Sequence, residues 1–307
     1  MELYKRFRPK RLKDLVGQPA AVAAIQGLLT KGWPQAALFS GPSGCGKTTA
    51  ARILKKKLGV VSDLDYREVN IAELRGINEV RKILEGAPMA ALGGSKCRLW
   101  VFDEVHQMTK DGQNCMLKVL EDTPEHAYFI LCTTDPHRLI KAIRTRCTPI
   151  RFGAVDPKEL KGLVQTVCEK EEVEVSETVV DEIVSAADGS PREALVLLNL
   201  VAPMKDEEQQ LAAVRTSAKT VPFNLVSALV FPKGDKKKVW KDTVVPMLQK
   251  LDDDPEGVRQ LILKVCETMI FRGYGRAAFV TMCFLEPVHY TGRAGLTFAA
   301  YRALMEE

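Results

Sequence analysis

The sequence contains no feature that would indicate a secreted or membrane-spanning protein. Its eight cysteines are scattered without a C-x-x-C pair, and no signal-peptide-like segment opens the chain. No stretch is long and apolar enough to cross a bilayer, and the sequence has no internal repeat or low-complexity tract. We therefore expect reduced thiols, no cysteine-bound metal, no membrane partner and a cytoplasmic location.

A strong charge of one sign is also lacking. The 307 residues include 44 Lys and Arg against 39 Asp and Glu, and the resulting net charge of +5 does not by itself indicate a nucleic-acid partner. Hydrophobic residues make up 46%, which is typical of a globular protein, and the length favours two or three domains. Basic residues do crowd the start of the chain: Lys5, Arg6, Arg8, Lys10, Arg11 and Lys13.

Short apolar runs alternate with helical patterns between residues 35 and 152. The runs Ala37–Ser40, Arg98–Phe102 and Tyr128–Cys132 have polar or glycine-rich ends and are typical of buried parallel strands. This alternation predicts an open α/β sheet, with its ligand site at the carboxyl ends of the strands. After Asp156 helical periodicity takes over, so we expect three domains: an α/β domain at 1–155 and helical domains at 156–219 and 220–307.

A phosphate-binding loop follows the first of these strands. Residues 41–48 satisfy the pattern G-x-x-x-x-G-K-[ST], between the run ending at Ser40 and a helical run. Glycines allow the backbone N–H groups to surround phosphates, Lys47 reaches the outer phosphates, and the Thr48 hydroxyl binds Mg²⁺. The expected nucleotide contacts in this region are Pro42, Ser43, Gly44, Cys45, Gly46, Lys47, Thr48 and Thr49.

Two further strand ends carry polar groups suited to phosphoryl transfer. The run 99–102 is followed by Asp103, which would hold Mg²⁺ with Thr48, and by Glu104, which would polarise the attacking water. The run ending at Cys132 is followed by Thr133 and Thr134. Either hydroxyl could contact the terminal phosphate or the water while the other caps the strand end, and we select Thr134 for the catalytic role.

Taken in order, seven short motifs resemble those of the clamp-loader branch of AAA+ ATPases over about residues 3 to 200. They are Phe7-Arg-Pro9, Val16-Gly-Gln18, the phosphate-binding loop, Asp103-Glu-Val-His106, Thr133-Thr-Asp-Pro136, Thr145-Arg-Cys147 and Gly189-Ser-Pro-Arg192. The resemblance implies an α/β P-loop AAA+ domain with a parallel sheet, followed by a helical lid and a C-terminal all-helical collar domain for oligomerisation.

The same resemblance implies roles for residues outside the loop. Arg192, which opens a lid helix, would contact the phosphates of its own subunit, and Arg146 would act as an arginine finger in a neighbouring subunit. Arg75 and Arg81 would contact DNA phosphates. Asn70 resembles a residue that restrains the catalytic glutamate, and Gln113 resembles one that links subunits, although either could be an ordinary surface amide. The implied adenine contacts are Arg8, Pro9, Val16 and Gly17.

The expected function is that of an ATP- and Mg²⁺-dependent motor subunit that opens a sliding clamp and loads it on primer-template DNA, with hydrolysis stimulated by DNA. The resemblance implies a ring-like, pentameric assembly with other clamp-loader subunits, in a phage-infected or prokaryotic cell. No zinc is expected, because only Cys97 lies between the loop and the acid pair. The alternatives are a DNA helicase or recombination motor of the same class, and a non-catalytic scaffold subunit that binds ATP poorly.

Overall fold

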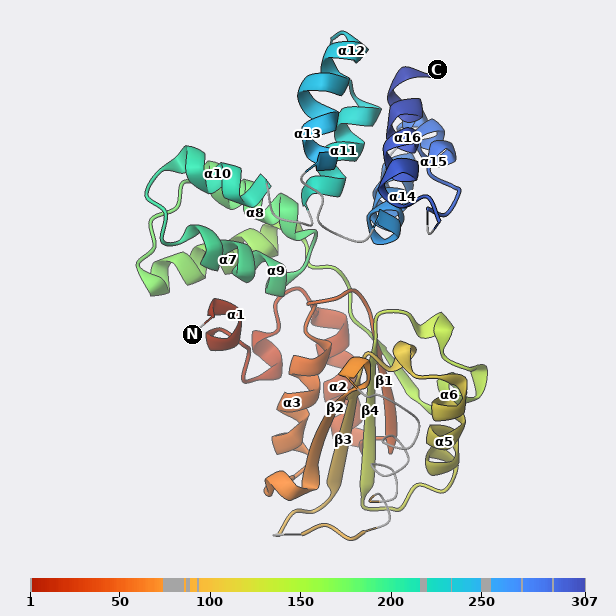
Figure 1. Cartoon of the computed structure of the whole chain (residues 1–307). Helices are drawn as coiled ribbons and strands as arrows, with labels where there is room; N and C mark the ends of the chain where they lie inside the picture. Colours follow the sequence, from red (N-terminus) through yellow and green to blue (C-terminus); the bar gives the residue numbers. More distant parts are fainter. Residues whose placement is uncertain are drawn as a thin grey trace. The chain divides into compact units, whose positions relative to one another are not determined.

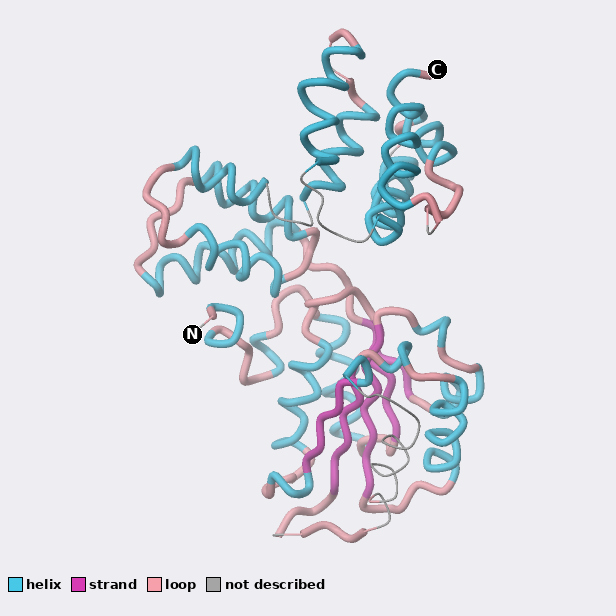
Figure 2. Tube along the Cα trace, in the orientation of Figure 1, coloured by secondary structure: helices cyan, strands magenta, loops and turns pink. Residues whose placement is uncertain are grey.

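The computed structural model describes residues 2–73, 86, 89–92, 94–215, 220–232, 234–249, 255–271, 273–288 and 290–306. The chain divides into two compact units, Met1–Pro203 and Met204–Glu307. Figure 1 shows the elements along the chain, and Figure 2 shows that the strands are confined to the first unit. The finer division into three domains at residues 155 and 219 stays a prediction.

A five-stranded parallel sheet forms the centre of the first unit. Its order is β2-β3-β4-β1-β5, so β4 lies between β1 and β3. The apolar runs predicted to be strands are confirmed as β1, β3 and β4. The strands are β1 (Ala36–Ser40), β2 (Tyr66–Asn70), β3 (Arg98–Asp103), β4 (Ala127–Thr133) and β5 (Thr148–Arg151).

Successive side chains of each strand enter different cores on the two faces of the sheet, as the two-residue period of a strand requires. Ala37 and Phe39 of β1 belong to one buried cluster, whereas Ala36 and Leu38 belong to the other. Figure 1 shows α2 and α3 on one side of the sheet and α5 and α6 on the other. These helices are α2 (Pro19–Lys31), α3 (Lys47–Lys57), α5 (Lys110–Glu121) and α6 (Lys141–Arg146).

Short 3₁₀ turns lie next to several of these elements. They are η1 (Leu12–Asp14), η2 (Asp63–Asp65), η3 (Ile71–Glu73), η4 (Val105–Gln107) and η5 (Pro136–Arg138). Two of them lie at the carboxyl ends of strands: η3 directly follows β2, and η4 follows β3 after Glu104. They therefore shape the edge of the sheet where a ligand would bind.

Three helices follow the sheet in the first unit: α7 (Pro157–Glu171), α8 (Glu177–Ala187) and α9 (Pro191–Val201). Each begins at a side chain that accepts a backbone N–H, namely Asp156, Ser176 and Ser190, and proline occupies the first turn of α7 and α9. Their apolar faces, including Val164, Ile183 and Leu198, are fully buried. These caps and faces fix where α9 begins, and α9 carries Arg192.

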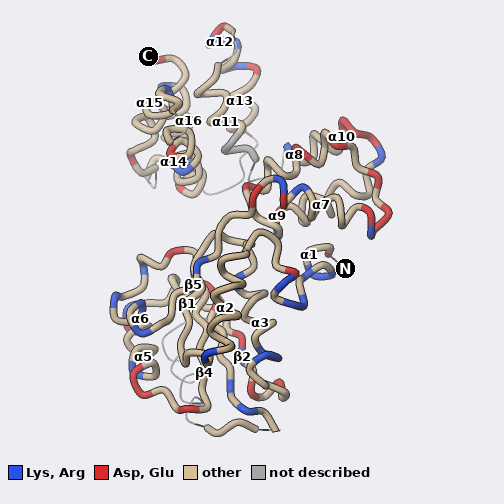
Figure 3. Tube along the Cα trace, turned by 180° about the vertical axis from the view of Figure 1, so that it is seen from behind, with Lys and Arg blue, Asp and Glu red and all other residues tan. Residues whose placement is uncertain are grey.

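The first helix, α1 (Leu3–Arg6), packs on α9 rather than on the sheet. The Leu3 backbone N–H lies 3.4 Å from Asn199 Oδ1, and Arg6 donates to Glu171 of α7 at 2.6 Å. Figure 3 shows the basic residues of this segment gathered around α1. Arg11 pairs with Asp14, so part of the N-terminal positive charge is balanced within the unit.

The second unit is helical throughout its described elements, and no helix in the described part of the chain is both long and apolar enough to span a bilayer. Its core contains apolar residues of α11, α14, α15 and α16. The elements are α10 (Glu207–Arg215), α11 (Thr220–Val230), α12 (Lys236–Val239), the π-helical turn η6 (Trp240–Val244), α13 (Val245–Gln249), α14 (Pro255–Phe271), α15 (Gly275–Cys283) and α16 (Gly292–Met305).

A buried ion pair anchors the first turn of α14 to the segment after α15. Arg259 Nε lies 3.0 Å from both carboxylate oxygens of Glu256, and its Nη1 donates to the Phe284 carbonyl at 2.8 Å. Glu256 also accepts the Val288 N–H at 2.8 Å. The hydrogen bonds from Arg259 hold the carboxylate charged, and they lower the pKa of Glu256 to about 2.

We expect Glu256→Gln to lower the melting temperature at pH 7 by several degrees, because Arg259 then remains buried without its counter-ion. A lowered carboxyl pKa stabilises the fold above the unfolded value near 4.5, and this contribution is lost as the pH falls from there toward 2. The difference in melting temperature between wild type and variant should therefore become smaller as the pH is lowered. Thermal unfolding of the whole chain at pH 7 and pH 3 measures it, with Glu267→Gln on the exposed face of α14 as the control. A gap that stays constant with pH would contradict this role.

Candidate active site

The loop between β1 and α3 has the backbone of a phosphate cradle. Gly44 and Gly46 adopt positive φ angles of 74° and 104°, which side chains with a Cβ rarely tolerate. Gly46 immediately precedes α3, so the N-terminus of that helix faces the loop. The sequence pattern predicted this strand-loop-helix arrangement, and the structure confirms it. Backbone N–H groups and the helix dipole together favour an anion at this position.

Lys47 is the first residue of α3, and its side chain reaches back into the loop that precedes the helix. It is 6% exposed, and its Nζ donates to the carbonyl oxygens of Gly41 at 2.8 Å and Pro42 at 2.7 Å. The Cys45 thiol also donates to the Pro42 carbonyl. Burial raises the pKa of Cys45, so this thiol stays neutral and adds no negative charge where phosphates would bind.

A hydrogen bond joins the start of α3 to the end of β3: the Thr48 hydroxyl donates to Asp103 Oδ2 at 2.7 Å. A hydroxyl and a carboxylate are the oxygen donors that Mg²⁺ accepts, and this ion takes its remaining ligands from water and phosphates. In the described part of the chain, no group of three or more His, Cys, Asp or Glu side chains could hold a metal ion alone. Thr48 and Asp103 thus fit a magnesium ion that arrives with a nucleotide.

Glu104 lies next to Asp103 and contacts a residue that the sequence reasoning did not assign. Its Oε2 is 3.3 Å from His106 Nδ1, and the same nitrogen is 3.3 Å from Thr133 Oγ1. The sequence signal was present, because His106 ends the quoted Asp103-Glu-Val-His106 motif, but a histidine two residues after a glutamate does not by itself indicate contact. Asn70, which the sequence left open between a restraint on the glutamate and an ordinary surface amide, donates to Glu73 at 2.8 Å.

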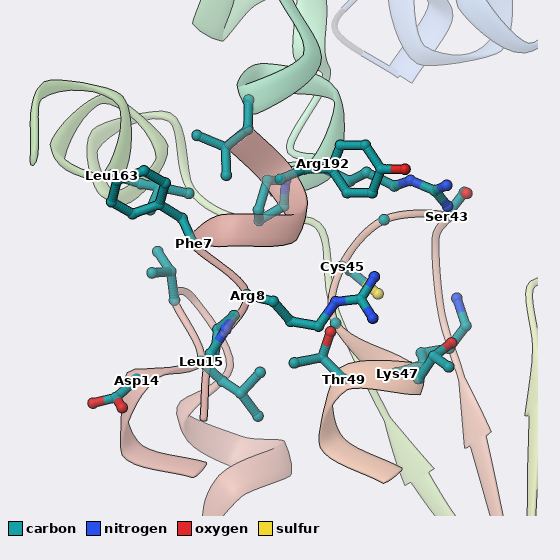
Figure 4. A pocket seen from close by; sticks show the side chains of 18 of the residues that line it. Phe7, Arg8, Asp14, Leu15, Ser43, Cys45, Lys47, Thr49, Leu163 and Arg192 are labelled. Carbon is teal, nitrogen blue, oxygen red and sulfur yellow. The ribbon is translucent and has the colours of Figure 1, made fainter. Parts of the chain in front are cut away.

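A pocket lies between the loop and helices α7 and α9. Arg192 lines it, with its guanidinium 5.1 Å from the centre of the Tyr4 ring. Figure 4 shows the Arg192 side chain extending toward Ser43, while the Arg8 guanidinium lies beside the loop near Cys45. Two arginines and Lys47 therefore converge on one cavity, which suits a polyphosphate.

Most predicted nucleotide contacts line this pocket, together with Asp103 and Glu104. They are Arg8, Pro9, Val16, Ser43, Gly44, Cys45, Gly46, Lys47, Thr48, Thr49 and Arg192. Pro42 is absent from the lining and contributes its carbonyl to Lys47 instead. Gly17 is absent too: its positive φ of 68° and an added Cβ 2.6 Å from Val155 give it a packing role. The lining residues that the sequence analysis did not select are Tyr4, Phe7, Asp14, Leu15, Leu163, Pro191 and Leu195.

Thr134, Arg146 and Gln113 do not line this pocket. Thr134 follows the end of β4 and does not line the cavity, whereas Thr133 contacts His106. Arg146, at the end of α6, pairs with Glu121 of α5. Gln113 is buried and bonds the Ile140 N–H and the Arg138 carbonyl, so it holds the segment before α6 within its own chain. Arg75 and Arg81 lie outside the described residues.

Two family models match parts of the first unit. The model described as "Rad17 P-loop domain" matches residues 2–84, and the model described as "DNA polymerase III, delta subunit" matches residues 59–156. Among sequence relatives, the DNA polymerase III subunit tau of Bacillus subtilis is 34% identical over 220 residues, which cover 64% of this chain and 38% of that protein. The gamma subunit of Buchnera aphidicola is 29% identical over 285 residues, covering 81% and 79%.

The replication factor C small subunit of Haloarcula marismortui is also similar, at 28% identity over 218 residues, 70% of this chain and 67% of that protein. The chain has an AAA+ P-loop fold and is similar to clamp-loader subunits. This AAA+ chain also shares its fold with a solved structure of RuvB from Thermotoga maritima, with a TM-score of 0.56 at 19% identity over 77% of this chain and 85% of that one. The chain spans only 38% of the length of relatives such as Bacillus subtilis tau.

The contact between Gly44 and α9 leads to a prediction. A Cβ on Gly44 would lie 2.2 Å from Ser190 Oγ and 3.0 Å from Arg192 Cβ, in a backbone conformation that favours glycine. Gly44→Ala must therefore displace either the loop or the start of α9, and we expect affinity for ATP to fall about tenfold. Titration of a fluorescent ATP analogue measures this affinity. Gly162→Ala in α7, where a Cβ meets nothing within 4 Å, is the matched control, and equal affinities in the two variants would refute the prediction.

Proposed function

We propose that this AAA+ chain is an ATP-hydrolysing motor subunit of a sliding-clamp loader. The observation that supports hydrolysis most directly is the junction at the sheet edge, where the Thr48–Asp103 hydrogen bond, Lys47 and Glu104 meet in one pocket. A scaffold that binds ATP poorly would not need this full set. The similarity to DNA polymerase III gamma and tau subunits and to a replication factor C small subunit favours clamp loading over a helicase or recombination motor.

In the proposed reaction, each residue has a role that follows from its position. The loop N–H groups and Lys47 would bind the β- and γ-phosphates. Thr48 and Asp103 would hold Mg²⁺, which would supply positive charge to the phosphates. Glu104 orients the attacking water. The Thr134 hydroxyl, one residue beyond the end of β4, does not line the pocket, and its proposed contact with the water or the terminal phosphate rests on the sequence pattern alone. Arg192 contributes positive charge from α9 of the same chain, and Arg8, Pro9 and Val16 line the adenine side.

Arg146 is proposed to act in the pocket of a neighbouring subunit. It lies at the end of α6, 38% of its side chain is exposed, and it does not line the pocket of its own chain. Its ion pair with Glu121 holds the guanidinium at the surface next to α5. An arginine supplied across an interface makes hydrolysis depend on assembly, because the site of each subunit is completed by the next one.

The proposed partners are a sliding clamp, primer-template DNA and other clamp-loader subunits in a ring of about five. ATP binding would favour the state that opens the clamp, and DNA contact would stimulate hydrolysis and release. DNA would be held through its backbone, so binding would be independent of sequence and would weaken with salt. Arg75 and Arg81 remain proposed phosphate contacts.

The first test is Glu104→Gln, which removes the carboxylate that orients water and leaves Lys47, Thr48 and Asp103 in place. We expect ATP affinity and ATP-dependent clamp association to be retained, while turnover falls about 10² to 10⁴-fold. Turnover is measured with saturating ATP, clamp and primed DNA, and association is measured by clamp pull-down. Glu125→Gln, an exposed residue before β4, is the control. Wild-type turnover in Glu104→Gln would remove this residue from the reaction, and absence of nucleotide-dependent clamp association in the wild type would refute clamp loading.

The second test is complementation between Lys47→Ala, which loses its own phosphate grip, and Arg146→Ala, which loses the arginine finger. Each variant alone should be nearly inactive, because loss of such a finger lowers turnover about 10³ to 10⁵-fold. Mixed before assembly, the two should recover part of the activity at interfaces that pair an intact loop with an intact finger. Arg138→Ala, exposed on η5, is the control for a surface arginine. Assembly is verified by sizing, and an assembled mixture no more active than its components would exclude action across the interface.

A further inference from the structure

Glu104, which lies between β3 and the turn η4, has an unusual backbone conformation. Its φ of 53° places it in the left-handed region. The other non-glycine residues with positive φ in the described part of the chain, Glu172 and Asp188, follow α7 and α8, where helices commonly end in this conformation. A non-glycine residue stays in this region only when contacts with its surroundings hold it there. The contacts of Glu104 therefore matter.

His106 is the side-chain partner of Glu104 among the described residues. It belongs to the turn η4, its side chain is only 12% exposed, and its Nδ1 is 3.3 Å from Glu104 Oε2. The same Nδ1 is 3.3 Å from the hydroxyl of Thr133, which is fully buried at the end of β4. Thr133 Oγ1 also accepts the Asp135 N–H at 3.0 Å, so the position of this hydroxyl is fixed. The imidazole therefore lies between the carboxylate of Glu104, which follows β3, and the fixed hydroxyl of Thr133 at the end of β4.

The chemistry of the three groups determines which imidazole nitrogen carries a proton. A carboxylate accepts hydrogen bonds only, so a bare Nδ1 lone pair facing Glu104 would be repelled, whereas an Nδ1–H would be attracted. Thr133 can either accept from Nδ1–H or donate to a bare Nδ1, so its contact fits both tautomers. The nearby Glu104 carboxylate is what favours the tautomer with a proton on Nδ1.

Asn70 does not supply this restraint. Its backbone is in register with Asp103, but its side-chain amide donates to Glu73 Oε1 at 2.8 Å and its amide oxygen accepts the Ala72 N–H at 3.2 Å. Both functional ends of the amide are used within the turn η3. The side chain at the end of β2 is thereby occupied. The contact with Glu104 comes instead from His106 of η4, which also contacts Thr133 at the end of β4, the other neighbour of β3.

We propose that His106 is a positioning residue for Glu104: its Nδ1–H holds the carboxylate in one rotamer, and the contact with Thr133 fixes the imidazole. The inference rests on the proposed function, in which Glu104 orients water. A carboxylate that samples several rotamers spends less time in the productive geometry, and misplacement by about 1 Å can lower turnover by up to about 10²-fold. His106 acts through Glu104 and needs no contact with nucleotide.

Two substitutions separate this role from a structural one. His106→Leu keeps much of the volume and removes the donor, and His106→Asn keeps a donor near the position of Nδ1. In full-length protein with clamp and primed DNA, we expect His106→Leu to lower kcat about tenfold with KM for ATP almost unchanged, and His106→Asn to recover to within about threefold of wild type. His137→Leu, exposed on η5, is the matched control. A fluorescent ATP analogue and a melting curve verify binding and folding.

A double-mutant cycle tests whether His106 acts through Glu104. In a Glu104→Gln background the positioned carboxylate is gone, so His106→Leu should cause little further loss, and the two effects should be non-additive. Full additivity would mean that His106 contributes by another route. Unchanged kcat in His106→Leu, or failure of His106→Asn to regain activity, would also overturn the inference. If the wild-type protein hydrolyses ATP, these outcomes leave the proposed function standing.

An independent measurement does not require activity. Nitrogen-15 NMR of labelled histidine distinguishes the Nδ1–H tautomer from the Nε2–H tautomer, and comparison with His106→Asn identifies the signal among the four histidines. We expect the Nδ1–H form in wild type and a shifted Nδ1 signal in Glu104→Gln. The Nε2–H form would overturn the inference even if the protein proved not to hydrolyse ATP. If the wild-type protein shows no turnover but His106 is in the Nδ1–H form, the proposed function is refuted and the tautomer assignment stands.

Discussion

The hydrogen bond from Thr48 to Asp103 joins two segments whose strands are not neighbours in the sheet. Thr48 lies at the start of the helix after β1, Asp103 ends β3, and β4 runs between these strands. The bond can form only if all three strands are parallel and end at the same level, which the pairing of Ser40 with Thr133 and of Phe102 with Leu131 ensures. A slip of one residue would exchange the two faces of a strand and separate the hydroxyl from the carboxylate.

The end of β4 therefore lies between the ends of β1 and β3, and Glu104 follows the end of β3. This position explains why Thr133 is fully buried and why its hydroxyl can fix a histidine that belongs to the segment after β3. The other wall of the pocket depends on α9, which starts at the Ser190 cap and approaches Gly44 so closely that a methyl group would not fit. Loop and helix thus form one packed surface, and the position of Arg192 is determined by the same contact.

The sequence predicted those features that depend on local pattern. The alternation of apolar runs indicated β1, β3 and β4, and the fixed spacing of glycine, lysine and threonine located the loop. It could not show that Glu104 adopts a left-handed backbone, so the partnership with His106 was not foreseen. Nor could it show that Asn70 is engaged by Glu73, or that Tyr4 lies against Arg192, since these contacts depend on side-chain directions or on packing between distant segments. The roles of Arg146 and Thr134 depend on partners or ligands beyond a single chain.

The docking of α1 on α9 has a consequence for how the first unit is made. The Leu3–Asn199 contact spans 196 residues, and the Arg6–Glu171 contact spans 165. During synthesis the first helix has no native partner until the ribosome has released nearly the whole first unit, because chains fold as their segments emerge. Contacts of such high sequence separation form late and slowly. Since Tyr4 and Arg8 line the same pocket as Arg192, a nascent chain that ends before α9 carries only part of that cavity.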